Sequence, residues 1–159
     1  YFPINIIIII PMKNLFTFLC VGLSLFTNAQ DYSEVDLVLL SSVINSEAGG
    51  ESYQEKLRVG NVVLNRVQSK HYPDNIHDVI YQRKQFSGIC SALFRYDING
   101  DRGDIESIKA AKALLNGKKV LQPSIIGFFN EAHSTNKKFV ARIKSKVVFT
   151  SEAHSYFKA

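Results

Sequence analysis

The sequence contains few cysteines and histidines, and their scarcity excludes several kinds of protein. Only two cysteines occur, Cys20 and Cys90, and Cys20 lies in a segment with the features of a removable leader. Without Cys20 no internal disulfide is possible, so the fold is not a small disulfide-stabilised scaffold. The histidines are dispersed and form neither an H-x-x-x-H pair nor a Cys/His knuckle. We therefore expect no metal site and no cofactor.

Internal repeats, low-complexity linkers and nucleic-acid motifs are also missing after residue 30. There is no glycine-rich phosphate loop and no alternation of basic and aromatic residues, so we expect no nucleic-acid partner. The chain has 159 residues, of which 46% are hydrophobic and 21% charged, and these fractions are typical of a folded protein. This length suits one domain with a modest core.

The N-terminal segment predicts export. The chain starts at Tyr1 and its single methionine is Met12, so we expect residues 1–11 to be translation upstream of the true start; the alternative is a fragment. From Met12 a short positive region, an apolar stretch and small residues follow in the order of a signal peptide, which we place at 12–29. The expected mature protein, residues 30–159, is a secreted or periplasmic monomer of the cell envelope.

A membrane anchor made from residues 4–26 is the alternative interpretation of this segment. Pro11, Lys13 and Asn14 interrupt that run, and its second half alone is short for a membrane span. We therefore expect no stable membrane insertion once the signal peptide has been cleaved.

The chain is basic, with a formal net charge of +5 at pH 7, and the leader would remove only one basic residue, Lys13. A basic surplus favours anionic polymers such as cell wall polymers, and the alternative is ordinary solvated helix faces. Most of the surplus lies in the second half of the chain, at Lys109, Lys112, Lys118, Lys119, Lys137, Lys138, Lys144 and Lys146.

Hydrophobic periodicity predicts an α+β fold, in which helices dominate and a small antiparallel sheet comes last. We expect Gly49-Gly50 to end the first helix, Ser52 and Glu55 to form a capping box, and Gly117 to end the last long helix. Residues 150–153 are expected to join the last two strands as a hairpin. The predicted helices are 33–48, 52–69, 75–80 and 104–116, and the predicted strands are 125–129, 146–150 and 154–157.

Glu47 attracts attention because it follows Leu40, Val43 and Ile44 at helical spacing, which places its carboxyl on the apolar face. Burial and the negative end of the helix dipole both disfavour its anion. A carboxyl that stays protonated near neutral pH is suited to general acid catalysis. The alternative is an exposed glutamate on a frayed last turn.

The stretch S-E-A-G-G-E-S-Y-Q-E-K-L-R-V-G-N-V-V-L-N-R-V at residues 46–67 resembles the motif of the spore-cortex-lytic cell wall hydrolases, the SleB-like family. That motif reads roughly E-A-x-G-E, followed by a helix that ends V-x-L-N-R-V. Further matches follow in order: a segment from Tyr72 to Ser87, the strand Gly127-Phe128-Phe129-Asn130, and the terminal His154-Ser155-Tyr156-Phe157. The similarity covers about residues 35–157.

This resemblance implies a lysozyme-like α+β domain that cuts the glycosidic bond between N-acetylmuramic acid and N-acetylglucosamine in peptidoglycan. It implies Glu47 as the general acid/base of a lytic transglycosylase. The residues it implies for substrate binding are Glu51, Asn65, Gln85, Ser87, His154 and Tyr156. Each has an alternative: loop capping for Gln85 and Ser87, and a structural role in the core for His154 and Tyr156. Asn65 could instead support the Glu47 helix by a buried hydrogen bond or face solvent on its own helix.

A hydrolytic muramidase would normally need a second carboxylate, for which Glu51, Asp97, Asp101 and Asp104 are the candidates. A wall-binding protein with a degenerate catalytic site is the alternative from another class. The chain departs from the family at Gly49, where the family often has arginine, and at Glu152-Ala153, where glycines are usual.

Overall fold

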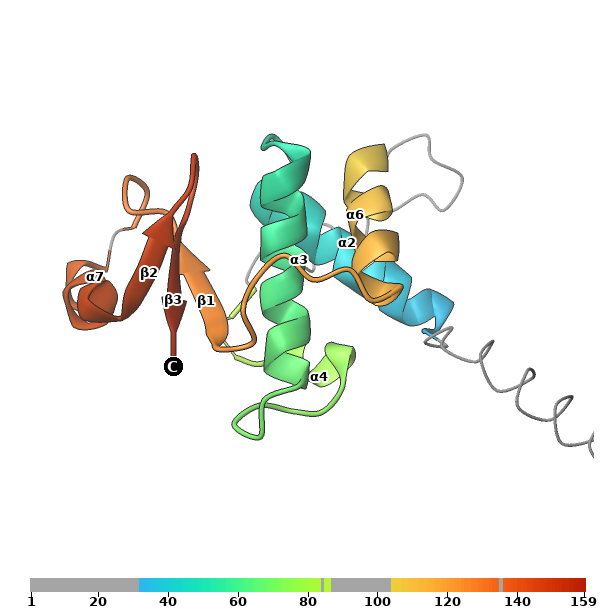
Figure 1. Ribbon diagram of the computed structural model, residues 1–159, viewed down its shortest axis with the longest axis horizontal. Coiled ribbons are helices and arrows are strands. Elements are labelled where there is room, and N and C mark those ends of the chain that lie inside the picture. Colours follow the sequence, from blue (N-terminus) through green and yellow to red (C-terminus); the bar gives the residue numbers. More distant parts are fainter. Residues whose placement is uncertain (1–31, 84, 87–103, 135) are drawn as a thin grey trace, which may run out of the picture. The chain divides into compact units, whose positions relative to one another are not determined.

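Helix α3, Tyr53–Val67, lies between two groups of elements in the computed structural model (Figure 1). Helices α2, Glu34–Ala48, and α6, Ile105–Leu115, pack against it and against each other, and the sheet contacts it on the other side. The short helix α4, Ile76–Ile80, contacts both α2 and α3. The structure describes residues 32–83, 85–86, 104–134 and 136–159. Residues 97–101, whose sequence D-I-N-G-D predicts a turn, lie outside these residues.

The helices begin at side-chain caps, which confirms most of the predicted starts. Ser33 and Asp36 form a reciprocal capping box before α2, and Asn75 and Asp104 cap α4 and α6. The predicted box at Ser52 is half wrong. The Ser52 hydroxyl accepts from the backbone N–H of Glu55 at 3.4 Å, but the Glu55 carboxylate does not return to Ser52 and is buried elsewhere.

The helix ends also agree with the prediction. Gly117 has φ of 92°, a left-handed conformation that suits glycine after α6. Helix α2 ends at Ala48, although Gly49 is still right-handed at φ −57°. The carbonyl oxygen of Gly49 is bound by the ammonium group of Lys56 at 2.9 Å. A lysine from the next helix therefore stabilises the end of α2.

The core lies among α2, α3 and α6. Leu40, Val43 and Ile44 of α2 are fully buried, so the predicted core face of that helix is confirmed. Helical spacing predicts an apolar stripe of Ile105, Ile108, Ala111 and Leu115 on α6, and this is partly wrong because Ile105 is 57% exposed. The side chains that α6 buries are instead Ser107, Ala110, Ala111, Leu114 and Leu115.

The sheet has three strands in the order β1-β3-β2, and both pairings are antiparallel. The strands are β1, Ile125–Phe129, β2, Val147–Thr150, and β3, Ser155–Lys158, close to the predicted ranges. The predicted hairpin is confirmed, since the N–H of Ser151 donates to the carbonyl of His154 at 2.8 Å.

One helix was not predicted. Helix α7, Lys137–Ile143, and the short 3-10 turn Lys144–Lys146 lie between β1 and β2, where the sequence pattern indicated only strands. Asn136 caps α7 by accepting from the N–H of Phe139. The Phe139 ring packs at 6.3 Å from both Phe129 and Phe157, which attaches α7 to the sheet.

Polar side chains of α3 hold the segment that leads into β1. Asn61 accepts from the backbone N–H groups of residues 120 and 121 at 2.7 and 2.9 Å. Asn65 donates to the carbonyls of residues 122 and 125, both at 2.8 Å, and Arg66 donates to that of residue 126 at 2.7 Å. The position of β1 relative to α3 is thus fixed largely through backbone groups. In the described ranges no helix is both long and apolar enough to cross a membrane.

Candidate active site

A cleft of about 710 Å³ lies where the ends of α2 and α3 meet β1, β3 and α7. Glu47 contributes the end of α2, and Arg66 the last turn of α3. Gln85 and His154 also line the cleft. The structure thus brings together three of the residues singled out from the sequence: Glu47, Gln85 and His154.

Glu47 is a half-buried carboxyl in this cleft, about one helical turn after the fully buried Val43 and Ile44. Burial raises the pKa of Glu47 above its usual value of 4.5, and the charge of His154 acts in the opposite direction. The C-terminal end of α2 adds to the effect of burial because the negative end of the helix dipole opposes an anion. This environment favours the protonated form of Glu47 that a general acid requires.

The turn after Glu47 is held by the buried side chain of Lys56. Its ammonium group donates to the carbonyls of Gly49 and Glu51 at 2.9 and 2.7 Å, and pairs with Asp104 at 3.1 Å. Only 3% of the Lys56 side chain is exposed, so these contacts are shielded from water. They stabilise the end of α2 that carries Glu47.

Arg66 places a buried cation at the wall of the cleft. Its guanidinium lies over the rings of Tyr72 and Phe86 at 5.4 and 5.3 Å, and donates to Gln85 Oε1 at 2.9 Å. Burial lowers the pKa of Arg66, and the neighbouring Tyr72 opposes this effect, but an arginine remains charged under ordinary conditions. Because Arg66 holds its oxygen, Gln85 presents its amide group in a defined orientation.

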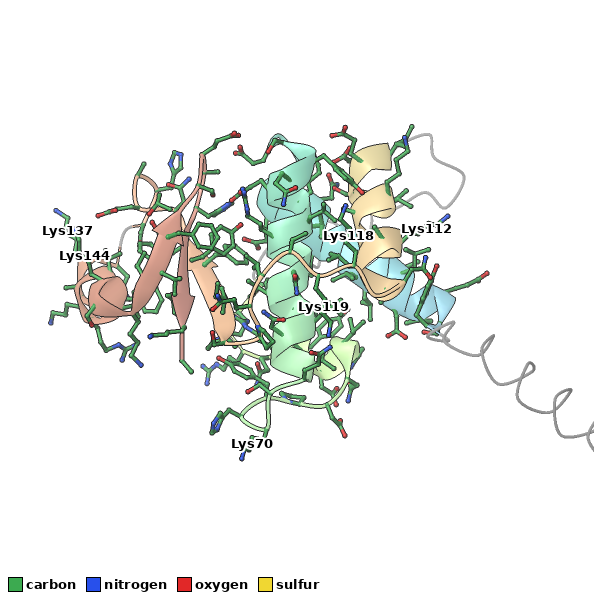
Figure 2. All side chains as sticks on the ribbon, viewed as in Figure 1. Lys70, Lys112, Lys118, Lys119, Lys137 and Lys144 are labelled. Atoms are coloured by element: carbon green, nitrogen blue, oxygen red, sulfur yellow. The ribbon has the colours of Figure 1, made fainter. Side chains whose placement is uncertain are left out.

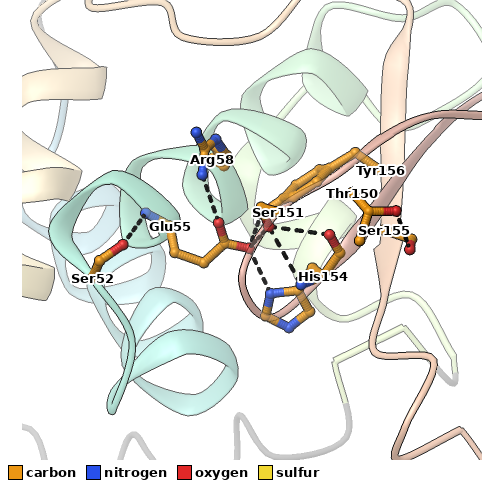
Figure 3. Close-up of polar contacts among 8 residues, drawn as sticks. All are labelled: Ser52, Glu55, Arg58, Thr150, Ser151, His154, Ser155 and Tyr156. Atoms are coloured by element: carbon orange, nitrogen blue, oxygen red, sulfur yellow. Dashed lines mark hydrogen bonds and ion pairs between the residues drawn. The ribbon is translucent and has the colours of Figure 1, made fainter.

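His154 connects the cleft to a buried network behind it (Figure 3). Its Nδ1 lies 2.8 Å from Glu55 Oε1, and the same oxygen accepts from Ser151 Oγ at 2.7 Å and from the Tyr156 hydroxyl at 2.8 Å. Arg58 pairs with the other oxygen, Oε2, at 2.9 Å. Tyr156 is fully buried in a small hydrophobic cluster with Val62 and Ile125 and does not line the cleft, so its hydroxyl binds Glu55 and its role is the structural one.

The remaining sequence candidates lie elsewhere. Asn65 is buried, but its side-chain amide donates to the backbone that enters β1 and not to the helix of Glu47, so the expected support of that helix is wrong. Glu51 does not line the cleft, and its carbonyl is bound by Lys56. Ser87 lies outside the described residues, as do Asp97 and Asp101. Asp104 caps α6 and pairs with Lys56, so it is committed to structural contacts.

Basic side chains surround the cleft on the side of the sheet and α7. Arg142, Lys146 and Lys158 line it together with Arg66, and Glu47 is the one acidic side chain among the described lining residues. The other lysines are not gathered there: those labelled in Figure 2 lie on separate parts of the fold, from Lys70 to Lys112 and Lys137. The described part of the chain contains no cluster of three or more potential metal-binding side chains.

Sequence reasoning missed Glu55, and the periodicity that identified Glu47 could have found it. Glu55 is fully buried and precedes the fully buried Val59 and Val62 by four and seven residues. Arg66 continues the same helix face four residues after Val62. A carboxylate and a guanidinium thus lie at the two ends of a row of buried valines. Charged groups on a buried helix face need specific partners, so this pattern predicts them.

Two sets of known proteins resemble this chain in sequence. A sequence model of the family described as Cell Wall Hydrolase matches residues 50–157, a range that starts three residues after Glu47. The spore cortex-lytic enzyme of Oceanobacillus iheyensis is 28% identical over 109 residues, which are 67% of this chain and 37% of that enzyme. The one from Halalkalibacterium halodurans is 36% identical over 59 residues, 37% of this chain and 18% of that enzyme. The match thus spans little more than a third of the first of these curated relatives and less than a fifth of the second.

Two solved structures share the fold. The catalytic domain of the germination-specific lytic transglycosylase SleB from Bacillus anthracis has a TM-score of 0.68 and 22% identity, with 80% of this chain and 98% of that chain covered. The catalytic domain of SleB from Bacillus cereus has a TM-score of 0.66 and 23% identity, with 80% and 92% covered. The predicted α+β fold, mainly helical with a small antiparallel sheet, is confirmed by these matches.

Proposed function

This chain belongs to the cell wall hydrolase family, and we propose that it is a peptidoglycan lytic transglycosylase. In this proposal it cuts the glycosidic bond between N-acetylmuramic acid and N-acetylglucosamine and leaves 1,6-anhydromuramic ends. The relatives named as spore cortex-lytic enzymes and the neighbour named as a lytic transglycosylase support this reaction. Wall remodelling, division and lysis are all compatible roles, and sporulation is not required.

The observation that carries the proposal is the Glu47 carboxyl inside the cleft. Burial raises its pKa, which favours the protonated carboxyl that a general acid needs in order to donate to a glycosidic oxygen bound in the cleft. Val43 and Ile44, fully buried one turn earlier, anchor the helix that carries it, and Lys56 holds the turn that follows. The position of the Glu47 carboxyl is therefore fixed by buried side chains before it and by hydrogen bonds after it. A catalytic acid needs such a fixed position.

One carboxyl can complete the reaction. Glu47 gives its proton to the glycosidic oxygen while the bond from muramic C1 to that oxygen breaks. The resulting Glu47 carboxylate then takes the proton of the muramic C6 hydroxyl as its oxygen bonds to C1 and closes the anhydro ring. The proton returns to Glu47, water is not consumed, and the substrate itself supplies the nucleophile.

The walls of the cleft suit a glycan strand that carries anionic groups. Arg142, Lys146 and Lys158 line it, and peptidoglycan has free carboxylates on its peptide stems. Gln85, held at its oxygen by Arg66, can donate from its amide nitrogen to a sugar hydroxyl or an N-acetyl oxygen. These contacts would position the bond to be cut next to Glu47.

The decisive experiment is digestion of purified peptidoglycan, with the products identified by mass spectrometry. We expect the wild type to release muropeptides one water lighter than lysozyme products, and Glu47→Gln to release none. Glu34→Gln is the matched control, because Glu34 is an exposed carboxylate on the first turn of the same helix. It should behave like the wild type.

The two alternatives would give different results in this experiment. Hydrated, reducing ends from an active wild type would identify a hydrolytic muramidase and direct the search for a second carboxylate to Asp97 and Asp101. A folded wild type that binds several kinds of wall without cutting them would identify a binding protein with a degenerate site. In that case Glu47→Gln would leave binding unchanged.

We also propose that the protein acts in the cell envelope after export. The substrate lies outside the cytoplasmic membrane, and the segment at 12–29 has the order of charges and apolar residues of a signal peptide. Fractionation of cells that express a C-terminally tagged chain should find a shortened form outside the cytoplasm. A full-length form retained inside the cell would contradict export.

A further inference from the structure

The carboxylate of Glu55 is fully buried and has four side-chain partners, but it does not line the cleft. Three hydrogen bonds reach its Oε1, from Ser151, His154 and Tyr156, and Arg58 binds its Oε2 (Figure 3). Ser151, His154 and Tyr156 belong to the β2–β3 hairpin and its turn. The network therefore joins α3 to the hairpin beside the cleft, which His154 lines together with Phe157 and Lys158 of β3.

Glu55 is ionised in the folded protein. Burial alone would raise its pKa, but the hydrogen bonds from His154, Ser151, Tyr156 and Arg58 outweigh burial and lower it to about 2. An ionised carboxylate has no proton to donate, so the hydrogen between Glu55 and His154 belongs to His154 Nδ1. The contact selects one arrangement of the imidazole, with its proton on Nδ1.

The other ring nitrogen of His154, Nε2, points away from Glu55 (Figure 3). His154 lines the cleft with Glu47; burial raises the pKa of Glu47, and a positive charge on His154 acts against that rise. The ring of Phe128 packs edge-on at 5.0 Å and limits its rotation. The groups that face His154 are thus Glu55, Ser151 and Tyr156 on one side, and Phe128 and Glu47 on the cleft side.

We infer that Glu55 is a positioning residue that holds the Nδ1–H of His154 and so presents Nε2 to the cleft, where His154 acts beside Glu47 in the reaction. This inference rests on the proposed function. With its proton on Nδ1 bound by Glu55, the imidazole presents Nε2 to the cleft as a hydrogen-bond acceptor. There Nε2 accepts from a sugar hydroxyl and so holds the glycan strand in position beside Glu47, and no proton needs to pass through His154.

A purely structural role for Glu55 is the competing explanation, since the network also attaches the hairpin to α3. Four variants of the whole protein separate the two: Glu55→Gln, His154→Gln, the double variant, and the control Thr150→Val. Thr150 belongs to the same hairpin and its hydroxyl contacts Ser155 at 2.9 Å, so this control removes a hydrogen bond of the hairpin without touching Glu55.

Two readouts are needed. Nitrogen-15 NMR of the imidazole reports which ring nitrogen carries the proton, and we expect Nδ1 in the wild type and a mixture of tautomers in Glu55→Gln. Initial rates on peptidoglycan should fall at least about tenfold in Glu55→Gln and in His154→Gln, with kcat affected more than KM. The double variant should be no slower than His154→Gln, because Glu55 acts through His154. Thr150→Val should stay within about twofold of the wild type.

Several outcomes overturn the inference. One is a folded Glu55→Gln with the wild-type tautomer and rate; another is a double variant whose losses multiply. If Glu55→Gln does not fold, the NMR measurement on the wild type still tests the inference. A neutral His154 that carries its proton on Nε2 would contradict the proposed role of Glu55. A wild type that cuts no peptidoglycan overturns the proposed function together with the catalytic part of this inference. An active wild type that loses activity in Glu47→Gln but not in His154→Gln overturns this inference alone.

Discussion

Replacing Glu55 by glutamine should remove a large part of the acid sensitivity of this protein. The pKa of Glu55 is about 2 in the folded state against 4.5 as its usual value, which corresponds to about 3 kcal/mol of folding free energy. Because the folded-state pKa is the lower one, this stabilisation is complete above pH 4.5 and disappears as the pH falls towards 2. For a domain with a total stability of about 5–15 kcal/mol this is a substantial share.

The assay is chemical denaturation followed by circular dichroism at pH 7, 5, 4 and 3. Between pH 7 and 3 the wild type should lose about 2 kcal/mol more than Glu55→Gln, since the carboxylates that both proteins share cancel in the comparison. Glu34→Gln, which changes an exposed carboxylate, should follow the wild type. A stability difference between wild type and Glu55→Gln that is the same at every pH would refute the reasoning.

Four further predictions concern the site and its support. Glu47→Gln should abolish cleavage but raise the thermal midpoint in calorimetry, because burial of the Glu47 anion opposes folding above its raised pKa. Gly60→Ala should cost about 1–3 kcal/mol in urea denaturation, because a Cβ there would lie 2.5 Å from a side-chain carbon of α6. Asn65→Ala should cost about 1–3 kcal/mol in the same assay, because two buried carbonyls lose their donor. Arg142→Gln combined with Lys146→Gln should weaken peptidoglycan binding in pull-downs and reduce its dependence on salt.

The elements with local signals were predicted well from the sequence. Helix α2 has a capping residue at Ser33 and a periodic apolar face, and both signals are read from neighbouring residues. Helix α7 was missed because it is a single short helix of seven residues whose apolar positions, such as Phe139 and Ile143, also fit a strand. Its helical state depends on packing of Phe139 against Phe129 in β1 and Phe157 in β3. Neither residue is a neighbour of the helix in the sequence.

In the candidate site, too, the features set by neighbouring residues were predictable and those set by distant residues were not. The orientation of Glu47 follows from spacing along one helix, so it could be inferred from the sequence. The network around Glu55 could not, because its partners Ser151, His154 and Tyr156 follow it by 96, 99 and 101 residues. Only the folded arrangement of α3 against the hairpin reveals that the carboxylate serves His154 and is not a helix cap.

The contacts that α3 makes with the segment before β1 have a consequence for natural variation. Asn61, Asn65 and Arg66 bind backbone N–H and carbonyl groups between residues 120 and 126, which every amino acid except proline provides in full. The segment should therefore accept many side chains at its exposed positions, whereas the three residues on the helix should accept very few. A saturation mutagenesis screen would show this asymmetry as a tolerant stretch facing three intolerant positions, with proline excluded at residues 120 and 121.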